Sequence, residues 1–382
     1  MEAIRVGRED SRGANASFAS KPVLVFWETT RACPLSCIHC RASAISDPLP
    51  GELSGDEGFR LIDEVTGFGK PYPTVVFTGG DPLKRRDLFD LLRYASDRGV
   101  GFAASPAASD LLTTDSLERL RASGATSISI SLDGAAASTH DFIRRRDGTF
   151  EKTVWAIGKA AGLGLLVQVN TVVMRRNVLE LPRIFHLIRR LGVKVWEVFF
   201  LIQVGRGTGV EGIGPEEYES VCNFLYDASK YGIVVRTVEA PFIRRVAAGR
   251  VRSGPLWRDP GYLRMTSELF ALEGEPTGSS SIRSRGTLDG DGIVFVAYDG
   301  TIYPGGLLPV PLGNVKSDGL VSVYREHDLL RQIRARNLVG SCGACEFSHI
   351  CGGSRARAFA HGSDPLGSDP ACILAFPPTS RG

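Results

Sequence analysis

The sequence predicts an α/β fold whose core is a parallel β-sheet, and three observations lead to this prediction. Six apolar runs of strand length occur within residues 23–201, and continuous apolar runs are typical of strands buried on both faces. Amphipathic stretches separate them, and strands joined through helices pair in parallel. Hydrophobic residues make up 43% of the chain and charged residues 23%, as in globular proteins. Six such units can form an open sheet or a curved, partial barrel, and the pattern alone allows both.

The elements are expected in a regular order after a loose tail, residues 1–20, which has no periodicity. Strands are expected at 23–27, 74–77, 101–104, 127–132, 165–173 and 194–201. Helices are expected at 55–68, 87–98, 115–123, 150–161 and 178–191. The Gly-rich stretch 205–214 marks the expected end of the repeat, before a helix near Pro215 and one more strand at 233–238. A mobile Gly- and Ser-rich loop at 273–292 and a hairpin at 293–303 follow.

Length and charge exclude several classes of protein. A chain of 382 residues is longer than one typical domain, so a main domain with an appendage is expected. Lys and Arg number 45 against 42 Asp and Glu, a net charge of +3 that does not indicate a nucleic-acid partner. The sequence shows no long apolar span and no signal peptide in residues 1–20, so a cytoplasmic protein without a membrane partner is expected.

The eight cysteines fall into groups that indicate metal binding rather than disulfides. Three lie within 33–40, four lie within 342–372, and Cys222 stands alone. Cys222 falls on the apolar side of an expected helix and is interpreted as a buried thiol.

The first group, Cys33, Cys37 and Cys40, is an incomplete set of metal ligands. Structural zinc takes four protein ligands, and only His39 is near enough to be the fourth, in a sterically awkward position. Thiolates without oxygen ligands select an iron–sulfur cluster or zinc. The spacing therefore favours a cluster with one iron open to a substrate.

The Cys-x3-Cys-x2-Cys loop after an apolar strand resembles the signature of the radical S-adenosylmethionine (SAM) enzymes. The resemblance implies a partial (β/α)6 barrel and a [4Fe-4S] cluster on Cys33, Cys37 and Cys40, whose open iron is chelated by SAM. One-electron reduction would cleave SAM to methionine and a 5′-deoxyadenosyl radical, which takes a hydrogen atom from the substrate. His39 falls where the family usually has an aromatic residue. The mouth of the barrel would lie at the C-terminal ends of the strands, where loops of parallel folds carry the chemistry.

Further motifs resemble the SAM-binding elements of that family. Thr78-Gly-Gly-Asp-Pro82 resembles the Gly-Gly-Glu-Pro element that binds the SAM amino group, with Asp81 in place of Glu. A turn after a strand is the simpler alternative. The Ser-Leu-Asp-Gly run that begins at Ser131 implies contacts of Ser131 with polar groups of SAM and of Arg144 with its carboxylate. A small-residue strand face and a solvated basic face are the alternatives, and Arg145 stands where Gly is usual.

The fifth and sixth strands would complete the SAM site. Asn170 lies within an apolar run, and a buried amide needs a partner, which the resemblance identifies as the SAM ribose. Leu201 and Val204 would flank the adenine, although ordinary barrel core is an equal alternative. No catalytic side chain is predicted. The predicted cofactor-binding set is His39, Thr78, Gly79, Gly80, Asp81, Pro82, Ser105, Ser131, Arg144, Asn170, Leu201 and Val204.

The second cysteine group contains Cys342, Cys345, Cys351 and Cys372, enough to close one cluster or one zinc site. Its spacing resembles the C-terminal half of the SPASM extension, which holds auxiliary [4Fe-4S] clusters. Because the hairpin carries no cysteine, the resemblance implies one auxiliary cluster, with structural zinc as the alternative. The expected domains are a barrel at 21–235, a connecting segment at 236–292 and a SPASM-like domain at 293–382.

The nearest branch of the family resembles the haem-maturation enzymes, which remodel tetrapyrrole side chains. The resemblance therefore implies an oxidoreductase acting on a tetrapyrrole or natural-product intermediate, with modification of a peptide or a sugar as alternatives. It also implies a small-molecule or peptide substrate and a reducing partner such as flavodoxin or ferredoxin. An iron–sulfur electron carrier and a zinc-stabilised scaffold are the non-enzymatic alternatives. Four arginines after the sixth strand are candidates to bind a substrate carboxylate or phosphate, with solvated surface as the alternative: Arg206, Arg236, Arg244 and Arg245.

Overall fold

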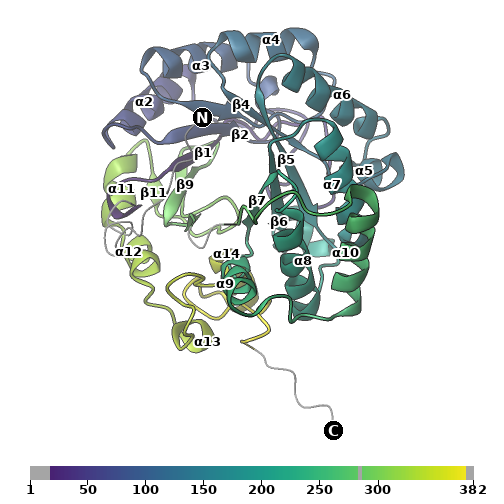
Figure 1. Cartoon of the computed structure of the whole chain (residues 1–382). Coiled ribbons are helices and arrows are strands. Elements are labelled where there is room, and N and C mark those ends of the chain that lie inside the picture. Colours follow the sequence, from purple (N-terminus) through teal and green to yellow (C-terminus); the bar gives the residue numbers. More distant parts are fainter. Residues whose placement is uncertain (1–17, 283–285, 376–382) are drawn as a thin grey trace.

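The protein is described by a computed structural model over residues 18–282 and 286–375. A curved sheet forms its centre, with helices packed around the outside (Figure 1). Seven parallel strands follow one another in sequence order. They are β1 Leu24–Glu28, β2 Thr74–Thr78, β3 Phe102–Ala104, β4 Ser127–Ser131, β5 Leu166–Val173, β6 Val195–Phe200 and β7 Val234–Val238. The six expected strands are confirmed, and β7 adds the further strand expected at 233–238.

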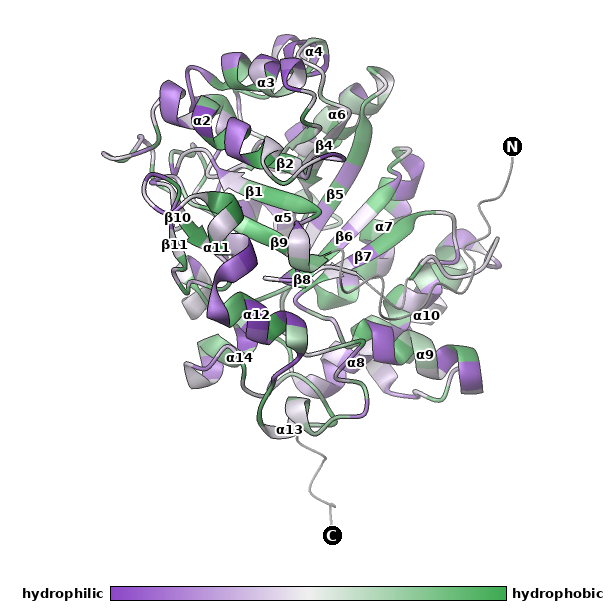
Figure 2. Ribbon diagram, turned by 90° about the vertical axis from the view of Figure 1, so that its left-hand side faces the viewer, coloured by the Kyte–Doolittle hydropathy of each residue, from purple (hydrophilic) through white to green (hydrophobic). Residues whose placement is uncertain are grey.

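Helices connect the strands across the outer face of the sheet (Figure 1). In the barrel they are α2 Gly55–Thr66, α3 Leu88–Asp97, α4 Thr114–Ala122, α5 Ala137–Arg144, α6 Thr149–Gly162, α7 Leu181–Arg190, α8 Pro215–Ala228, α9 Ile243–Ser253 and α10 Pro260–Glu273. The 3-10 turns are η1 Pro82–Lys84, η2 Val178–Glu180 and η3 Gly205–Gly209. Figure 2 shows hydrophobic residues concentrated on central strands such as β1 and β9, and hydrophilic residues on α2 and α4. None of the helices in the described ranges combines the length and hydropathy of a membrane span.

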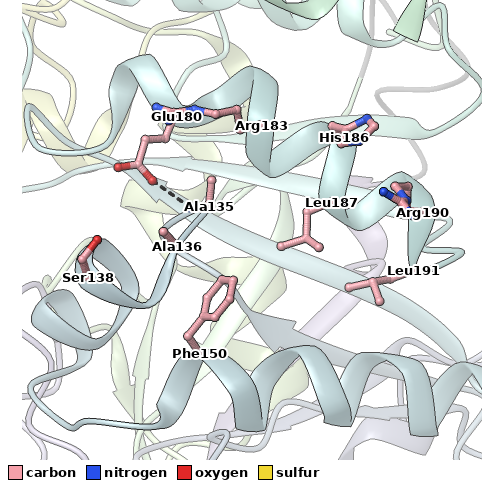
Figure 3. Close-up of a pocket in the computed structure, with 10 residues that line it drawn as sticks. All are labelled: Ala135, Ala136, Ser138, Phe150, Glu180, Arg183, His186, Leu187, Arg190 and Leu191. Carbon is pink, nitrogen blue, oxygen red and sulfur yellow. Dashed lines mark hydrogen bonds between the residues drawn. The ribbon is translucent and has the colours of Figure 1, made fainter. Parts of the chain in front are cut away.

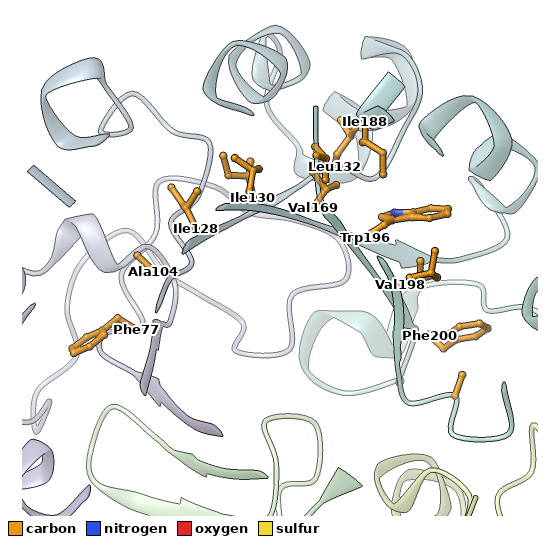
Figure 4. Packing of buried hydrophobic residues seen from close by; sticks show 14 of the residues in the cluster. Phe77, Ala104, Ile128, Ile130, Leu132, Val169, Ile188, Trp196, Val198 and Phe200 are labelled. Atoms are coloured by element: carbon orange, nitrogen blue, oxygen red, sulfur yellow. The ribbon is translucent and has the colours of Figure 1, made fainter. Parts of the chain in front are cut away.

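The alternation of side chains along the strands separates an apolar outer face from a polar inner face. On β6, Trp196, Val198 and Phe200 are fully buried and belong to the main apolar cluster under the helices (Figure 4). Successive strand residues point to opposite faces, so Glu197 and Phe199 face the interior of the curved sheet. Full burial of each large apolar side chain contributes roughly 1.5–3 kcal/mol. The outer face therefore stabilises the barrel, and the inner face is free to carry polar groups.

The C-terminal part of the chain continues the same sheet. Strand β9 (Gly292–Val296) pairs in parallel with β1, and β10 (Thr301–Tyr303) pairs antiparallel with β9, which confirms the expected hairpin. Short strands β8 (Leu288–Asp289) and β11 (Gly313–Asn314) extend it. In the described chain the sheet ends at β7 on one side and at β11 on the other.

Two expected domain boundaries need correction in the light of this pairing. The boundary at 235 falls inside β7, and the hairpin expected to begin the second domain is hydrogen-bonded into the barrel sheet. The expected boundaries were based on the composition of the sequence. The extent of the sheet in the structure depends instead on pairing between strands that are far apart in the chain. The remaining helices cover the C-terminal part: α11 Leu320–Glu326, α12 Asp328–Ala335, α13 Gly340–Gly343 and α14 Arg355–Gly362. The loose tail expected at 1–20 lies almost wholly outside the described residues.

Candidate functional site: two cysteine centres joined by the barrel

The first cysteine loop follows β1, at the C-terminal edge of the parallel strands. Cys33, Cys37 and Cys40 are free thiols and pack with Leu35 and Ala44 in a small apolar cluster. Backbone amides point at two of the sulfurs: the Leu35 N–H donates to Cys33 Sγ at 3.4 Å, and the Ala44 N–H donates to Cys40 Sγ at 3.5 Å. Such amide donors stabilise thiolates and tune iron–sulfur centres.

The glycines after β2 are required because this loop lies directly against the cysteine loop. Gly80 N donates to Thr30 O at 2.8 Å. A Cβ on Gly79 would lie 2.4 Å from Thr30 O, and a Cβ on Gly80 would lie 2.4 Å from Ala32 O. Gly79 also has a φ of +145°. The backbone that these glycines allow to approach closely is therefore that of the segment around Thr30 and Ala32.

The carboxylate of Asp81 supports the loop from inside the protein, which corrects its expected use as an acceptor for a ligand. The side chain is fully buried, and it accepts hydrogen bonds from Leu83 N at 3.1 Å and from the Ser109 hydroxyl at 2.8 Å. Burial raises the pKa of Asp81. Sequence reasoning identified the residue, but its orientation depends on Ser109, which lies 28 residues further along the chain.

Arg206 fastens the cysteine loop to the segment after β6. Its Nε donates to Cys37 O at 2.9 Å, its Nη1 donates to Ala44 O at 2.8 Å, and its backbone N donates to Cys40 O at 3.0 Å. Gly205 has a φ of +54°, and a Cβ there would lie 2.2 Å from Arg41 O. Two nitrogens of the Arg206 guanidinium therefore hold the loop, and the role considered for this residue in binding a substrate carboxylate or phosphate stays a prediction.

A buried charge network lies beside Cys37. Arg144 Nη2 lies 2.5 Å from Asp133 Oδ2, and Arg144 Nη1 lies 3.6 Å from Cys37 Sγ. Asp133 is fully buried and also accepts from Val172 N at 2.8 Å. His39 Nε2 lies 3.7 Å from Asp133, and burial lowers the pKa of His39 to about 4, so the ring is neutral. Asp133 was missed as a site residue, although the Ser-Leu-Asp-Gly run contains it.

Unpartnered donors in this network show room for a polar ligand. Arg144 Nε, His39 Nδ1 and Arg206 Nη2 are buried without a hydrogen-bond partner among the described residues. Buried donors without partners are costly, by about 1–3 kcal/mol each, so such groups indicate a missing acceptor. Three thiols, two of them with amide donors, beside buried cationic groups, fit an iron–sulfur cluster with an anionic co-ligand.

The other residues of the predicted SAM set lie at the same edge with different exposures. Ser105 is half-buried at the end of β3, where its N–H donates to Phe77 O at 2.9 Å. Thr78 O accepts from Thr29 N at 2.8 Å, and Pro82 is buried in η1. Leu201 is buried with Ile143 and Met174, whereas Val204 packs against a separate cluster around Ile202, Leu308 and Ala356. Leu201 and Val204 therefore pack in two different apolar clusters.

Four inward-facing polar residues form a row across neighbouring strands. The register pairs Ser131 with Asn170, Asn170 with Glu197, and Glu197 with Arg236, on β4 to β7. Gln168 Nε2 donates to Asn170 Oδ1 at 2.9 Å and to Glu197 Oε2 at 2.8 Å. Asn170 therefore belongs to a satisfied polar network, as its position in an apolar run predicted. Glu197 was not singled out from the sequence.

The second cysteine group is brought together as expected. Cys342, Cys345, Cys351 and Cys372 line one cavity of about 360 Å³. The Phe347, Gly353 and Asp369 N–H groups donate to the sulfurs of Cys345, Cys351 and Cys342, each at 3.4 Å. A Cβ on Gly353 would lie 2.9 Å from Cys342 Sγ. Four thiols around a cavity, with amide donors to three of them, fit a fully ligated cluster.

One buried thiol in each centre favours its protonated form when no cation is bound. Burial is the main cause that raises the pKa of Cys33 and of Cys351 to about 12, and neighbouring cysteines contribute to the same value. Bound metal lowers thiol pKa values and releases the protons. Among the residues in the described ranges, no three His, Cys, Asp or Glu side chains are arranged to hold a single metal ion.

A buried polar link ties the second centre to the end of β7. The Ser354 hydroxyl donates to Glu239 Oε2 at 2.5 Å, and Ser354 N donates to Asp369 Oδ2 at 2.8 Å. Arg357 contacts Asp369 at 3.2 Å and donates to Glu239 O at 2.9 Å. Glu239 also shares a hydrogen bond with Asp289, and burial raises the pKa of both carboxyls.

Two further arginines that were candidates for substrate binding have structural partners. Arg244 donates to Ile350 O at 3.0 Å and to Thr287 O at 2.9 Å, and Arg245 forms a buried ion pair with Glu219 at 2.5 Å. The substrate role considered for them is therefore wrong. Cys222 is fully buried in the main apolar cluster, as its helical position predicted. The loop expected at 273–292 contacts β7, since Val235 N donates to the Ser281 hydroxyl at 3.2 Å.

A larger cavity of about 630 Å³ lies on the outer, helical side of the sheet. Figure 3 shows Phe150 of α6 facing Leu187 and Leu191 of the α7 region across it, with Glu180 accepting from Ala135 N. It contains no cysteine and no residue of the polar row. We therefore place the candidate site at the inner face and the cysteine loops, not here.

Comparison with known proteins agrees with this geometry. Residues 27–188 match the Radical SAM superfamily. The chain is 35% identical to the AdoMet-dependent heme synthase of Nitratidesulfovibrio vulgaris, over 91% of each chain. It is 34% identical to the AdoMet-dependent heme synthase of Methanosarcina barkeri, over 94% of this chain and 98% of that one. SuiB of Streptococcus suis bound to S-adenosylmethionine has a similar fold, with a TM-score of 0.66 at 15% identity, covering 92% of this chain and 77% of SuiB.

Proposed function

The chain belongs to the radical SAM superfamily and is a SAM-dependent iron–sulfur enzyme, and from this premise we propose that it decarboxylates propionate side chains of an iron tetrapyrrole. Two relatives that it matches across nearly their whole length are named AdoMet-dependent heme synthase. The single structural observation that carries the proposal is the pair of centres, one with three thiols and one with four, on the same barrel. A three-thiol centre leaves a site for SAM, and a four-thiol centre does not.

The proposed reaction explains why two centres are needed. Conversion of a propionate to a vinyl group removes CO2, one hydrogen atom and one electron. When bound, SAM on the first cluster and the auxiliary cluster supply a hydrogen-atom acceptor and an electron acceptor for this change. Cys33, Cys37 and Cys40 would hold the first cluster, and Cys342, Cys345, Cys351 and Cys372 would hold the second.

The residues of the chain would place SAM and keep water away from it. The loop containing Gly79 and Gly80 and the donors of Arg144 and His39 border the first centre. We retain the predicted SAM set with one change, namely that the side chain of Asp81 positions its loop from within. The members that would contact SAM are His39, Thr78, Gly79, Gly80, Pro82, Ser105, Ser131, Arg144, Asn170, Leu201 and Val204, and Arg206 would fix the cysteine loop beneath them.

The electron that reduces the first cluster has to come from a partner protein. We propose a flavodoxin or ferredoxin as that partner and a cytoplasmic location for the reaction. Reduced flavodoxin should support turnover at a rate comparable to that with dithionite. Turnover with dithionite but none with reduced flavodoxin or ferredoxin would contradict this part of the proposal.

The experiment is anaerobic turnover of the iron-reconstituted enzyme. Iron coproporphyrin III, which carries propionates where haem carries vinyl groups, is incubated with SAM and reductant. We expect 5′-deoxyadenosine and haem to form together, with CO2 released for each vinyl group. Cys33→Ser should abolish both products, whereas Cys222→Ala serves as the matched control and should leave both in place. Formation of 5′-deoxyadenosine without any change in the porphyrin would contradict the proposed substrate.

A further inference from the structure

The polar row on β4 to β7 extends from the proposed SAM site to an exposed cation. Ser131 and Asn170 belong to the proposed SAM set, and the strand register continues the same row through Glu197 to Arg236. Cross-strand neighbours share one face of a sheet, so the four side chains project to the same side. Val235, next to Arg236, is buried in the main apolar cluster on the outer face. Arg236 therefore lies on the inner face.

Exposure increases along the row. Ser131, Asn170 and Glu197 are half-buried, whereas Arg236 is exposed, and Val234 on the same face of β7 is 41% exposed. Strand β7 is also the end of the sheet in the described chain. The inner face of β7 is thus accessible at Val234 and Arg236, where a carboxylate of a bulky ligand could reach the guanidinium.

Arg236 is the one member of the four candidate arginines whose guanidinium is not used to hold the fold. Arg206 clamps the cysteine loop, Arg244 binds two backbone carbonyls, and Arg245 is paired with Glu219. Within the described residues, Arg236 has no ion pair within 4.0 Å, and the carboxylate of Glu197 is its neighbour across the strand pair. Glu197 is itself fixed by Gln168 at 2.8 Å.

We propose that Arg236 binds a carboxylate of the substrate, with Glu197 as the positioning residue that holds the guanidinium on the inner face. This inference rests on the proposed function and names the anchor that the tetrapyrrole would use. A guanidinium presents two parallel N–H donors that match a carboxylate, and it stays charged at any working pH. A propionate on Arg236 would place the macrocycle along the row, with another part of it near Asn170 and SAM.

The test compares binding of two ligands to two variants of the reconstituted holoenzyme. The ligands are iron coproporphyrin III and its tetramethyl ester, which has the same ring without carboxylates, and the variants are Arg236→Gln and Arg236→Lys. Binding is followed by the change in porphyrin absorption with SAM present and no reductant. Arg121→Gln, which changes an exposed arginine on the outer helix α4, is the matched control. Iron content and circular dichroism confirm that each variant is folded and loaded.

We expect Arg236→Gln to weaken binding of the free acid by about 10- to 100-fold, the usual loss for a charge-assisted hydrogen bond. Arg236→Lys should recover part of this loss. Binding of the ester should be the same in all variants, and Arg121→Gln should match the wild type. Equal affinity of the wild type and Arg236→Gln for the free acid would overturn the assignment of Arg236. If the wild type does not bind the free acid at all, the proposed substrate is wrong, and so is the proposed role of Arg236 in binding it.

Discussion

The Nε of Arg206 donates to the carbonyl oxygen of Cys37 at 2.9 Å, across a sequence separation of 169 residues. This contact joins the loop after β6 to the loop after β1. With the contacts to Ala44 O and Cys40 O, one residue fixes three points of the cysteine loop. The geometry of the first centre therefore depends on a residue that follows β6, a strand that does not neighbour β1 in the sheet.

Replacement of Arg206 by Ala should loosen the first centre without affecting the second. The Cys37 and Ala44 carbonyls would lose their donors, at a cost of about 1–3 kcal/mol for each group left buried and unpaired. We expect iron bound per chain to fall and SAM affinity to drop. Iron analysis together with SAM titration checks this, and Arg121→Gln is the control. Full iron content and unchanged SAM affinity in Arg206→Ala would contradict the proposal that Arg206 holds the cysteine loop in place.

Replacement of Gly205 by Ala should be far more damaging than the same change four residues later in η3. Gly205 has a positive φ, and its Cβ would lie 2.2 Å from Arg41 O, whereas nothing lies within 4 Å of a Cβ on Gly209. Backbone strain of this kind costs on the order of 1–3 kcal/mol, and the clash adds to it. The measurement is the thermal midpoint of each anaerobic holoenzyme. Similar midpoints for Gly205→Ala and Gly209→Ala would be inconsistent with this packing.

The two cysteine groups should lose iron independently. Cys342→Ser or Cys372→Ser should remove about four irons per chain and leave the cluster that binds SAM, because four cysteines hold one [4Fe-4S] cluster. Cleavage of SAM should therefore persist while haem formation stops. Cys222→Ala, a cysteine of the apolar core, should keep all the iron. Zinc in place of iron at the second centre would show that it is a structural site.

The Glu239–Asp289 pair predicts a pH dependence of stability. Burial raises the pKa of both carboxyls, so the folded state retains a proton that the unfolded chain releases above about pH 4. The contribution of Glu239 and Asp289 to the free energy of unfolding is therefore lost as pH rises through their folded pKa values. The advantage of Asp289→Asn over the wild type should grow as the pH is raised from about 4 to the folded pKa values, by at most about 1.4 kcal/mol per pH unit. Thermal midpoints across that range check this.

Asp97→Asn provides the control for that series, because Asp97 is an exposed carboxylate on the last turn of α3. The difference in thermal midpoint between Asp97→Asn and the wild type should not change with pH in the same way. Parallel curves for Asp289→Asn and the wild type would mean that the buried pair does not hold an extra proton in the folded protein.

Much of the fold could be predicted from the sequence because its strands and helices have strong local patterns. Apolar runs located the six strands, and periodic stretches located five helices. The short helix α5 was not expected, since residues 137–144 have little apolar periodicity. The placement of β9 beside β1 was also missed, because pairing between residues 24 and 293 leaves no local signal.

The site could be predicted only as far as its motifs reach. Cysteine spacing located both centres, and the Ser-Leu-Asp-Gly run led to Arg144. The direction of each side chain depends on partners outside its own motif or strand end. Asp133 orients Arg144, and Ser109 orients Asp81. Arg236 was one of four equivalent candidates until the partners of the other three were known.

The parallel pairing of β1 with β9 has a consequence for how the protein is made. During translation β1 has no neighbour on that edge until residues 292–296 have left the ribosome, so the loop that carries Cys33 is flanked on one side only for most of synthesis. The four cysteines of the second centre emerge later still. Each metal centre thus reaches its final surroundings only after these later segments have been made, and iron delivery should act after that point rather than on a shorter nascent chain.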